Sequence, residues 1–135
     1  MNPHVRKILE LLSDLYEEKE LDYHLSDTET CRIRMNESLA HTLLTNLIKN
    51  AIIHSPDHGR VDIVIHSARI EIINDGNQAL DKQQIFKRFY KGNAGQKEST
   101  GLGLSIAQSI ANLYHIKLTY YHDGRHHFVL KIAKP

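Results

Sequence analysis

The stretch Ser-Thr-Gly-Leu-Gly-Leu-Ser-Ile-Ala, residues 99–107, joins a polar segment to the start of an amphipathic helix. Gly101 and Gly103 allow the backbone to approach an anion closely, because neither carries a side chain. The first turn of a helix adds unpaired N–H groups and a partial positive charge. The junction therefore indicates a phosphate site, although glycines before a helix are also typical of a simple turn.

Length and composition indicate one ordinary domain. The 135 residues are 41% hydrophobic and 24% charged, a balance that allows a buried core. The formal net charge of +1 gives no field that would attract nucleic acid or an anionic membrane. The single Cys31 cannot form an internal disulfide, which fits a reducing compartment. No stretch has the roughly 20 apolar residues that cross a bilayer, so we expect a cytoplasmic protein without nucleic-acid or membrane contacts.

The spacing of apolar residues predicts three main helices. They extend over residues 2–19, from the expected N-cap Asn36 to Ser55-Pro56, and over residues 103–114. Asn2-Pro3 is the expected N-cap and first-turn pair of the first helix. A short helical turn is expected at residues 81–90, and the polar segment 91–100 is expected to be mobile.

Alternation of apolar and polar residues predicts the strands of one mixed, mostly antiparallel sheet. The expected strands are 21–25 paired with 31–35, a hairpin over 60–74, and a final hairpin of 116–121 with 127–132 about Asp123-Gly124. His126 and His127 would then point to opposite faces of the sheet. Helices and strands together predict an α+β fold with one helical layer on the sheet.

Two asparagines one turn apart lie on the second predicted helix. Asn46 and Asn50 project from one face, with His54 one turn further on, while leucines occupy the other face. Asparagine is an indifferent helix former, so two of them in mid-helix suggest a role beyond structure. An amide oxygen is a hard ligand that suits Mg²⁺ on the phosphates of a nucleotide. A solvated polar face is the alternative, and these residues alone do not decide between the two.

Asn74 ends the predicted 60–74 hairpin and is followed by Asp75-Gly76-Asn77. Ligands often bind where strands end, and this side chain could accept a hydrogen bond from the exocyclic amine of adenine. An ordinary Asp-Gly turn is equally compatible with the segment. Phe86 and Phe89, three residues apart, are expected to anchor the next segment to the core.

Four segments, taken in order, resemble motifs of a known family. Asn46-Leu-Ile-Lys-Asn50-Ala, Asn74-Asp-Gly76, Phe86-Lys-Arg-Phe89-Tyr90 and Thr100-Gly-Leu-Gly-Leu104 resemble the N box, first glycine box, F box and second glycine box of sensor histidine kinases. Their order and spacing also agree. The resemblance covers nearly the whole chain and is to the catalytic, ATP-binding domain within the GHKL (Bergerat) ATPases. It implies a Bergerat-type two-layer α/β sandwich, with residues 1–135 as one such domain and the dimerisation and phosphoacceptor domain absent.

The resemblance implies a role for individual residues. Asn50 and Asn46 would hold Mg²⁺ on the phosphates of ATP, with His54 as a phosphate or ribose neighbour. Asn74 would read adenine, and Gly76 would form the turn beneath the base. The implied nucleotide contacts further include Phe89, Thr100, Leu104 and the backbone N–H groups of Gly101, Leu102 and Gly103, with residues 91–99 as a lid and Arg88, Lys91 and Lys97 as further phosphate contacts.

Three positions depart from the family pattern. Asn74 replaces the usual adenine-reading aspartate, although an amide can still accept one hydrogen bond and donate another. Gln78 replaces the second glycine of the first glycine box, which would stiffen the loop beneath the base. Lys49 stands where many relatives carry an acidic residue that is proposed to act as a base or to orient water.

The implied activity is transfer of the γ-phosphoryl group of Mg-ATP to a histidine on a separate helical dimerisation domain, and from there to an aspartate of a response regulator. Such transfer needs positioning and charge neutralisation more than covalent help from the protein. His4-Val5-Arg6-Lys7 does not resemble the acceptor box, so we expect no self-phosphorylation. A catalytically inactive nucleotide-binding or interaction module and a GHKL serine kinase acting on a regulatory protein are the alternatives.

Overall fold

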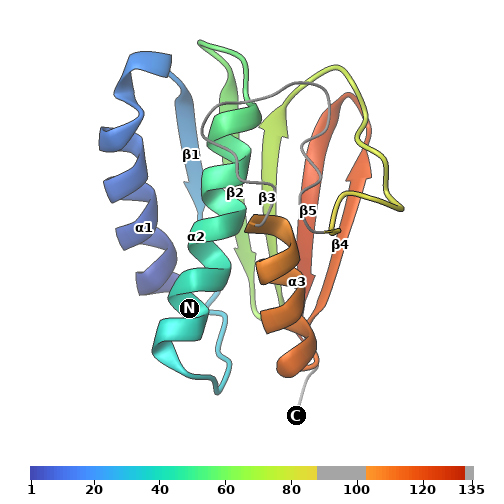
Figure 1. The fold of residues 1–135 in the computed structure, drawn as a ribbon. Coiled ribbons are helices and arrows are strands. Elements are labelled where there is room, and N and C mark those ends of the chain that lie inside the picture. Colours follow the sequence, from blue (N-terminus) through green and yellow to red (C-terminus); the bar gives the residue numbers. More distant parts are fainter. Residues whose placement is uncertain (88–102, 133–135) are drawn as a thin grey trace.

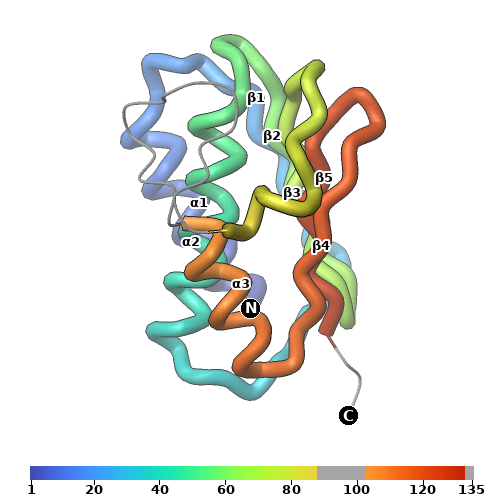
Figure 2. Tube along the Cα trace, turned by 45° about the vertical axis from the view of Figure 1, so that its right-hand side comes forward, coloured from blue at the N-terminus to red at the C-terminus, as the bar shows by residue number. Residues whose placement is uncertain are grey.

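The computed structural model describes residues 1–87 and 103–132, and within these residues the chain forms two layers. Figure 1 shows the helices α1 (Asn2–Leu15), α2 (Glu37–His54) and α3 (Gly103–Leu113) side by side, with α2 in the middle. In the turned view of Figure 2, all three helices lie on one side of the strands. The strands are β1 (Asp22–Ser26), β2 (Arg60–His66), β3 (Arg69–Asp75), β4 (Lys117–His122) and β5 (Arg125–Lys131).

The five strands form one mixed sheet in the order β1-β2-β3-β5-β4, counted over the described residues. β1 runs parallel to β2, and the other neighbouring strands are antiparallel. The long connection between the parallel strands contains α2, which lies on the sheet as a crossover helix does. The predicted α+β fold, with three helices on a mixed and mostly antiparallel sheet, is confirmed.

The core lies between the helices and one face of the sheet. Strand residues alternate in burial, so that Ile63 of β2 and its register partner Ile72 of β3 both point toward the helices. Each such isoleucine stabilises the fold by about 1.5–3 kcal/mol. α2 is the most buried helix, and it covers the sheet with Ala40, Leu43, Leu44, Leu47, Ile48, Ala51, Ile52 and Ile53.

The predicted pairing of residues 21–25 with 31–35 is wrong. β1 pairs with β2 instead, and residues 31–35 form no strand. Their backbone is held by α1, because the Asn2 side chain accepts from the Cys31 N–H at 3.0 Å and donates to the Glu29 carbonyl at 2.9 Å. Cys31 is nevertheless buried, and Ile33 and Met35 pack against the core. The alternation of apolar and polar residues over 31–35 therefore predicted correctly which side chains are buried, but it did not indicate whether a strand pairs with this segment.

The predicted caps and ends of the helices α1 and α2 are confirmed in part. Asn36 caps α2 as expected, since its Oδ1 accepts from the Leu39 N–H at 3.0 Å. Asn2 is not a cap, because the N-cap of α1 is Met1 and the Asn2 amide is used across the fold. α1 ends at Leu15, and the 3₁₀ turn η1 (Glu17–Lys19) continues the predicted helical stretch.

The predicted short helical turn after the first hairpin is also present where the structure describes it. The Ile85 N–H donates to the Asp81 carbonyl at 2.9 Å, which closes one helical turn, and Ile85 is buried in the core. Residues 88–90 of the predicted turn, and the segment 91–100 that was expected to be mobile, lie outside the described residues.

Replacing Asn2 with alanine is expected to lower the free energy of unfolding by about 1–3 kcal/mol, because the buried Cys31 N–H would lose its acceptor. Equilibrium unfolding in urea measures this change. Asn112→Ala is the matched control, since Asn112 is exposed on α3 and its replacement should change the free energy by less than about 0.5 kcal/mol. Equal stability of both variants would contradict the role of Asn2.

Candidate functional site

Three polar residues on α2 form a line along one side of the helix, which we call the α2 stripe: Asn46, Asn50 and His54. All three are half-buried, and they span about 12 Å along the helix axis. At one end of the stripe, a Cβ atom added to Gly103 would lie 3.3 Å from Asn46 Oδ1. The fold thus brings an amide of the predicted N box to the first residue of α3.

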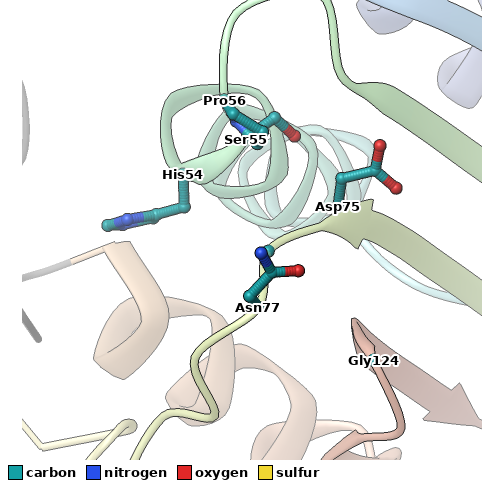
Figure 3. Close-up of a pocket in the computed structure, with 7 residues that line it drawn as sticks. His54, Ser55, Pro56, Asp75, Asn77 and Gly124 are labelled. Carbon is teal, nitrogen blue, oxygen red and sulfur yellow. The ribbon is translucent and has the colours of Figure 1, made fainter.

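At its other end the α2 stripe reaches a pocket of about 520 Å³. The pocket is lined by residues from three separate segments: His54, Ser55 and Pro56 at the end of α2, Asp75 at the end of β3 with Gly76 and Asn77 after it, and Gly124 between β4 and β5. Figure 3 labels all of these residues except Gly76. Burial, and to a smaller extent the Lys19 ammonium, lowers the pKa of His54. His54 therefore adds an uncharged imidazole to the pocket at neutral pH.

Asn74 provides a buried acceptor that has no partner. The residue is 1% exposed, and it lies on the face of β3 that points to the helices. Its Nδ2 donates to the Asp75 carbonyl at 3.1 Å, while its Oδ1 has no hydrogen-bond partner in the described part of the chain. Leaving such an atom unpaired costs about 1–3 kcal/mol. A ligand with an N–H donor would satisfy it, and the exocyclic amine of adenine is such a donor.

A network of two arginines and two aspartates holds the end of β3, and sequence reasoning missed it. Arg125 of β5 forms ion pairs with Asp75 at 2.7 Å and with Asp62 at 2.8 Å. Arg60 pairs with Asp62 through its side chain, and its backbone N–H donates to Asp75 at 3.0 Å. Burial alone would raise the pKa of Asp62, but the hydrogen bonds from both arginines bring it below its usual range. The network joins β2, β3 and β5 beside the pocket.

A second network that the sequence did not reveal connects the β4–β5 hairpin to the loop 76–80. His122 Nε2 donates to the Gly76 carbonyl at 2.7 Å, and the Tyr120 hydroxyl accepts from the Leu80 N–H at 2.9 Å. The same hydroxyl lies 2.7 Å from His126 Nδ1. The expected opposite orientation of the last two histidines is confirmed, because His127 instead contacts Asp123 and stacks on Tyr121. The alternation of the residues along β4 and β5 and the register of this hairpin are the pattern that could have placed Tyr120, His122 and His126 on one face.

Of the remaining residues that the sequence singled out, some lie in the described part of the chain and the others lie outside it. Leu104 follows Gly103 in α3 and packs against the core, Lys49 is half-buried on α2, and Gln78 is exposed in the loop 76–80. No group of three His, Cys, Asp or Glu side chains that could hold a metal ion occurs among residues 1–87 and 103–132. Phe89, Thr100, Gly101, Leu102, Arg88, Lys91 and Lys97, together with the expected lid 91–99, lie outside the described residues.

Residues 35–134 match the family model described as histidine kinase-, DNA gyrase B-, and HSP90-like ATPase. The chain is 38% identical over 112 residues to the heme sensor protein HssS of Staphylococcus epidermidis. The matched region covers 79% of this chain and 25% of HssS. It is 30% identical over 141 residues to the sensor histidine kinase HprS of Escherichia coli, covering 100% of this chain and 30% of HprS. The chain thus spans between a quarter and a third of the length of these curated relatives.

Solved structures share the fold. The catalytic domain of histidine kinase ThkA matches with a TM-score of 0.83 and 22% identity, over 99% of this chain and 92% of that one. ThkA in complex with the response regulator protein TrrA matches with a TM-score of 0.80 and 23% identity, over 100% of this chain and 40% of that one.

Among the described residues, no helix is both long and apolar enough to span a membrane.

The stability of the chain is expected to fall between about pH 6.5 and pH 4 through His126. Burial above all, and then His122, His54 and His127, lowers the pKa of His126 to about 4. Its pKa in the unfolded chain is about 6.5, so within this window the unfolded state binds more protons and acidification favours unfolding. The loss is at most about 1.4 kcal/mol per pH unit, the limit for one proton.

Urea unfolding of wild type and His126→Leu at several pH values measures this contribution. The variant has lost the titrating imidazole, so its free energy of unfolding should fall less steeply than that of wild type from pH 6.5 to pH 4. Equal slopes in the two proteins would contradict the assignment.

Proposed function

The chain belongs to the histidine kinase-, DNA gyrase B-, and HSP90-like ATPases, and from this premise we propose that it binds ATP with Mg²⁺ and transfers the γ-phosphoryl group to a histidine of a separate helical dimerisation domain. The observation that carries the proposal is the unpaired, buried Asn74 Oδ1, in the residue that directly precedes the pocket-lining Asp75. Adenine offers the amine that this acceptor lacks, and the amide can donate as well as accept. Asn74 therefore fits adenine although it replaces the aspartate of the family pattern.

The proposed nucleotide follows the α2 stripe. Its base would lie in the pocket near Gly76, with His54 as a phosphate or ribose neighbour, and its phosphates would extend toward Asn46 and the start of α3 at Gly103. The first turn of α3 presents N–H groups and a partial positive charge to an anion. Phe89, Thr100, Gly101, Leu102 and Leu104 are proposed as further contacts of the nucleotide, and residues 91–99 as its lid.

Asn46 and Asn50 are the proposed ligands of Mg²⁺. Both are half-buried on the same side of α2, and neutral amide oxygens suit this hard cation, which usually keeps several waters and binds the phosphates as well. When bound, the ion would neutralise charge on the phosphates. The contribution of the chain is to orient the phosphates between the α2 stripe and α3, and to hold the base end fixed.

The proposed partners are the dimerisation and phosphoacceptor domain and the receiver domain of a response regulator, with residues 1–135 acting as one domain in the cytoplasm. The relatives HssS and HprS are described as a heme sensor and a sensor histidine kinase. ThkA has been solved together with its response regulator. These neighbours support the proposal that this chain supplies the kinase step of a two-component system.

Replacing Asn50 with alanine is expected to weaken Mg-ATP binding at least about tenfold, equal to about 1.4 kcal/mol, because one metal ligand is lost. Titration calorimetry with ATP, in MgCl₂ and in EDTA, measures the change. In EDTA the variant and wild type should bind alike, and His41→Ala, an exposed change on α2, should behave as wild type throughout. Unchanged affinity of Asn50→Ala in MgCl₂ would remove Asn50 from the site.

Incubation with Mg-ATP labelled at the γ-phosphate and a supplied helical acceptor domain tests the transfer itself. We expect label on a histidine of the acceptor and none on this chain alone. Label on serine would replace the proposal with a serine kinase, and binding without transfer would make the chain a non-catalytic nucleotide-binding module. In that last alternative, the departures from the family pattern at Asn74, Gln78 and Lys49 mark lost activity.

A further inference from the structure

Three side chains of the β4–β5 hairpin hold both ends of the loop that follows Asn74. We call Tyr120, His122 and His126 the hairpin clamp. At the start of the loop 76–80, His122 Nε2 donates to the Gly76 carbonyl at 2.7 Å. At its end, the Tyr120 hydroxyl accepts from the Leu80 N–H at 2.9 Å. The clamp therefore fixes the backbone on either side of the loop's central residues.

Burial of side chains does not hold the middle of this loop. Asn77, Gln78 and Ala79 are all exposed, whereas Tyr120 and His126 of the clamp are buried. Both ends of the loop are fixed by polar side chains of one hairpin, which restricts the positions that its exposed middle can take. Each of these hydrogen bonds contributes direction as well as energy, because it weakens steeply when it is bent.

His126 also fills the space directly beneath Gly76. A Cβ atom on Gly76 would lie only 2.3 Å from His126 Nε2, so the loop passes over the imidazole where only glycine fits. In the register of β3 and β5, His126 is the partner of Asn74. The imidazole thus lies next to the residue that is proposed to read adenine, on the same face of the sheet.

The three members of the clamp support one another. The Tyr120 hydroxyl lies 2.7 Å from His126 Nδ1, and its ring packs on that of Phe128 with centroids 5.0 Å apart. The ring of His126 packs on that of His122 of β4 with centroids 5.0 Å apart, and burial lowers the pKa of His126 so that it is neutral at pH 7. A neutral imidazole can accept a hydrogen bond from the Tyr120 hydroxyl at Nδ1, while the hydroxyl oxygen accepts from the Leu80 N–H. The contact between Tyr120 and His126 is therefore one between neutral groups at pH 7.

We propose that Tyr120, His122 and His126 are positioning residues that hold the loop 76–80 against the base of the nucleotide, and that they set the preference of the site for adenine. The inference rests on the nucleotide-binding function proposed above. It assigns to the β4–β5 hairpin a part in recognition of the base, whereas the α2 stripe and α3 serve the phosphates.

Tyr120→Phe and His122→Phe test the clamp, because each removes a hydrogen-bonding group and keeps an aromatic ring. Affinities for Mg-ATP, Mg-GTP and Mg-tripolyphosphate are measured by calorimetry, and melting temperatures by circular dichroism. We expect each variant to bind ATP at least about fivefold more weakly and to lose part of its preference for ATP over GTP. Binding of tripolyphosphate, which has no base, should stay within a factor of two of wild type.

Tyr121→Phe is the matched control, since Tyr121 is the neighbouring residue on the opposite face of β4 and should leave all three affinities unchanged. If Tyr120→Phe does not fold, His122→Phe at the partly exposed position decides alone. Wild-type ATP affinity and selectivity in the folded variants would overturn the clamp, as would an equal loss for ATP and tripolyphosphate, which indicates a merely structural role. Failure of wild type to bind any of the three ligands would instead overturn the proposed function.

Discussion

The most demanding constraint on this fold is a buried side-chain oxygen, Asn74 Oδ1, that accepts no hydrogen bond within the described residues. Asn74 Oδ1 is buried at the end of a central strand, on the mostly apolar face of the sheet. A buried acceptor without a donor destabilises the folded chain, so its place must be enforced by the surroundings. β3 does this because it is hydrogen-bonded to β2 on one side and to β5 on the other. The strand pairing of β3 therefore holds the Asn74 acceptor in a fixed place.

Some elements around Asn74 fix the end of β3 and the loop after it, and others carry the proposed nucleotide contacts. Arg60, Asp62 and Arg125 tie the end of β3 to its two neighbours from the far side of the sheet. The hairpin clamp fixes the loop that follows, and α2 passes over the helix-facing side with its polar stripe. The α2 stripe and the start of α3 thus lie on a sheet whose strand ends are joined by ion pairs and side-chain hydrogen bonds.

The elements with strong periodicity were predictable from the sequence, and so was the order of the motifs. The 60–74 hairpin and the three helices were found because their apolar residues recur at period 2 or 3.6 over many residues. The strand predicted at 31–35 was wrong because alternation describes which side chains are buried, whereas pairing depends on where the backbone finds partners, here Asn2. The clamp was missed for a related reason. Its members are far from Gly76 in sequence, and only the register of β4, β5 and β3 brings them together.

The close contact between Gly76 and the imidazole of His126 links two distant positions of the chain. Any larger residue at position 76 would have to take the volume that the ring occupies, so it could be accommodated only with a smaller residue at 126. Two sites that are 50 residues apart, one in a loop and one in a strand, should therefore evolve as a pair. Transplanting the loop from a relative into this scaffold would require its matching strand residue as well.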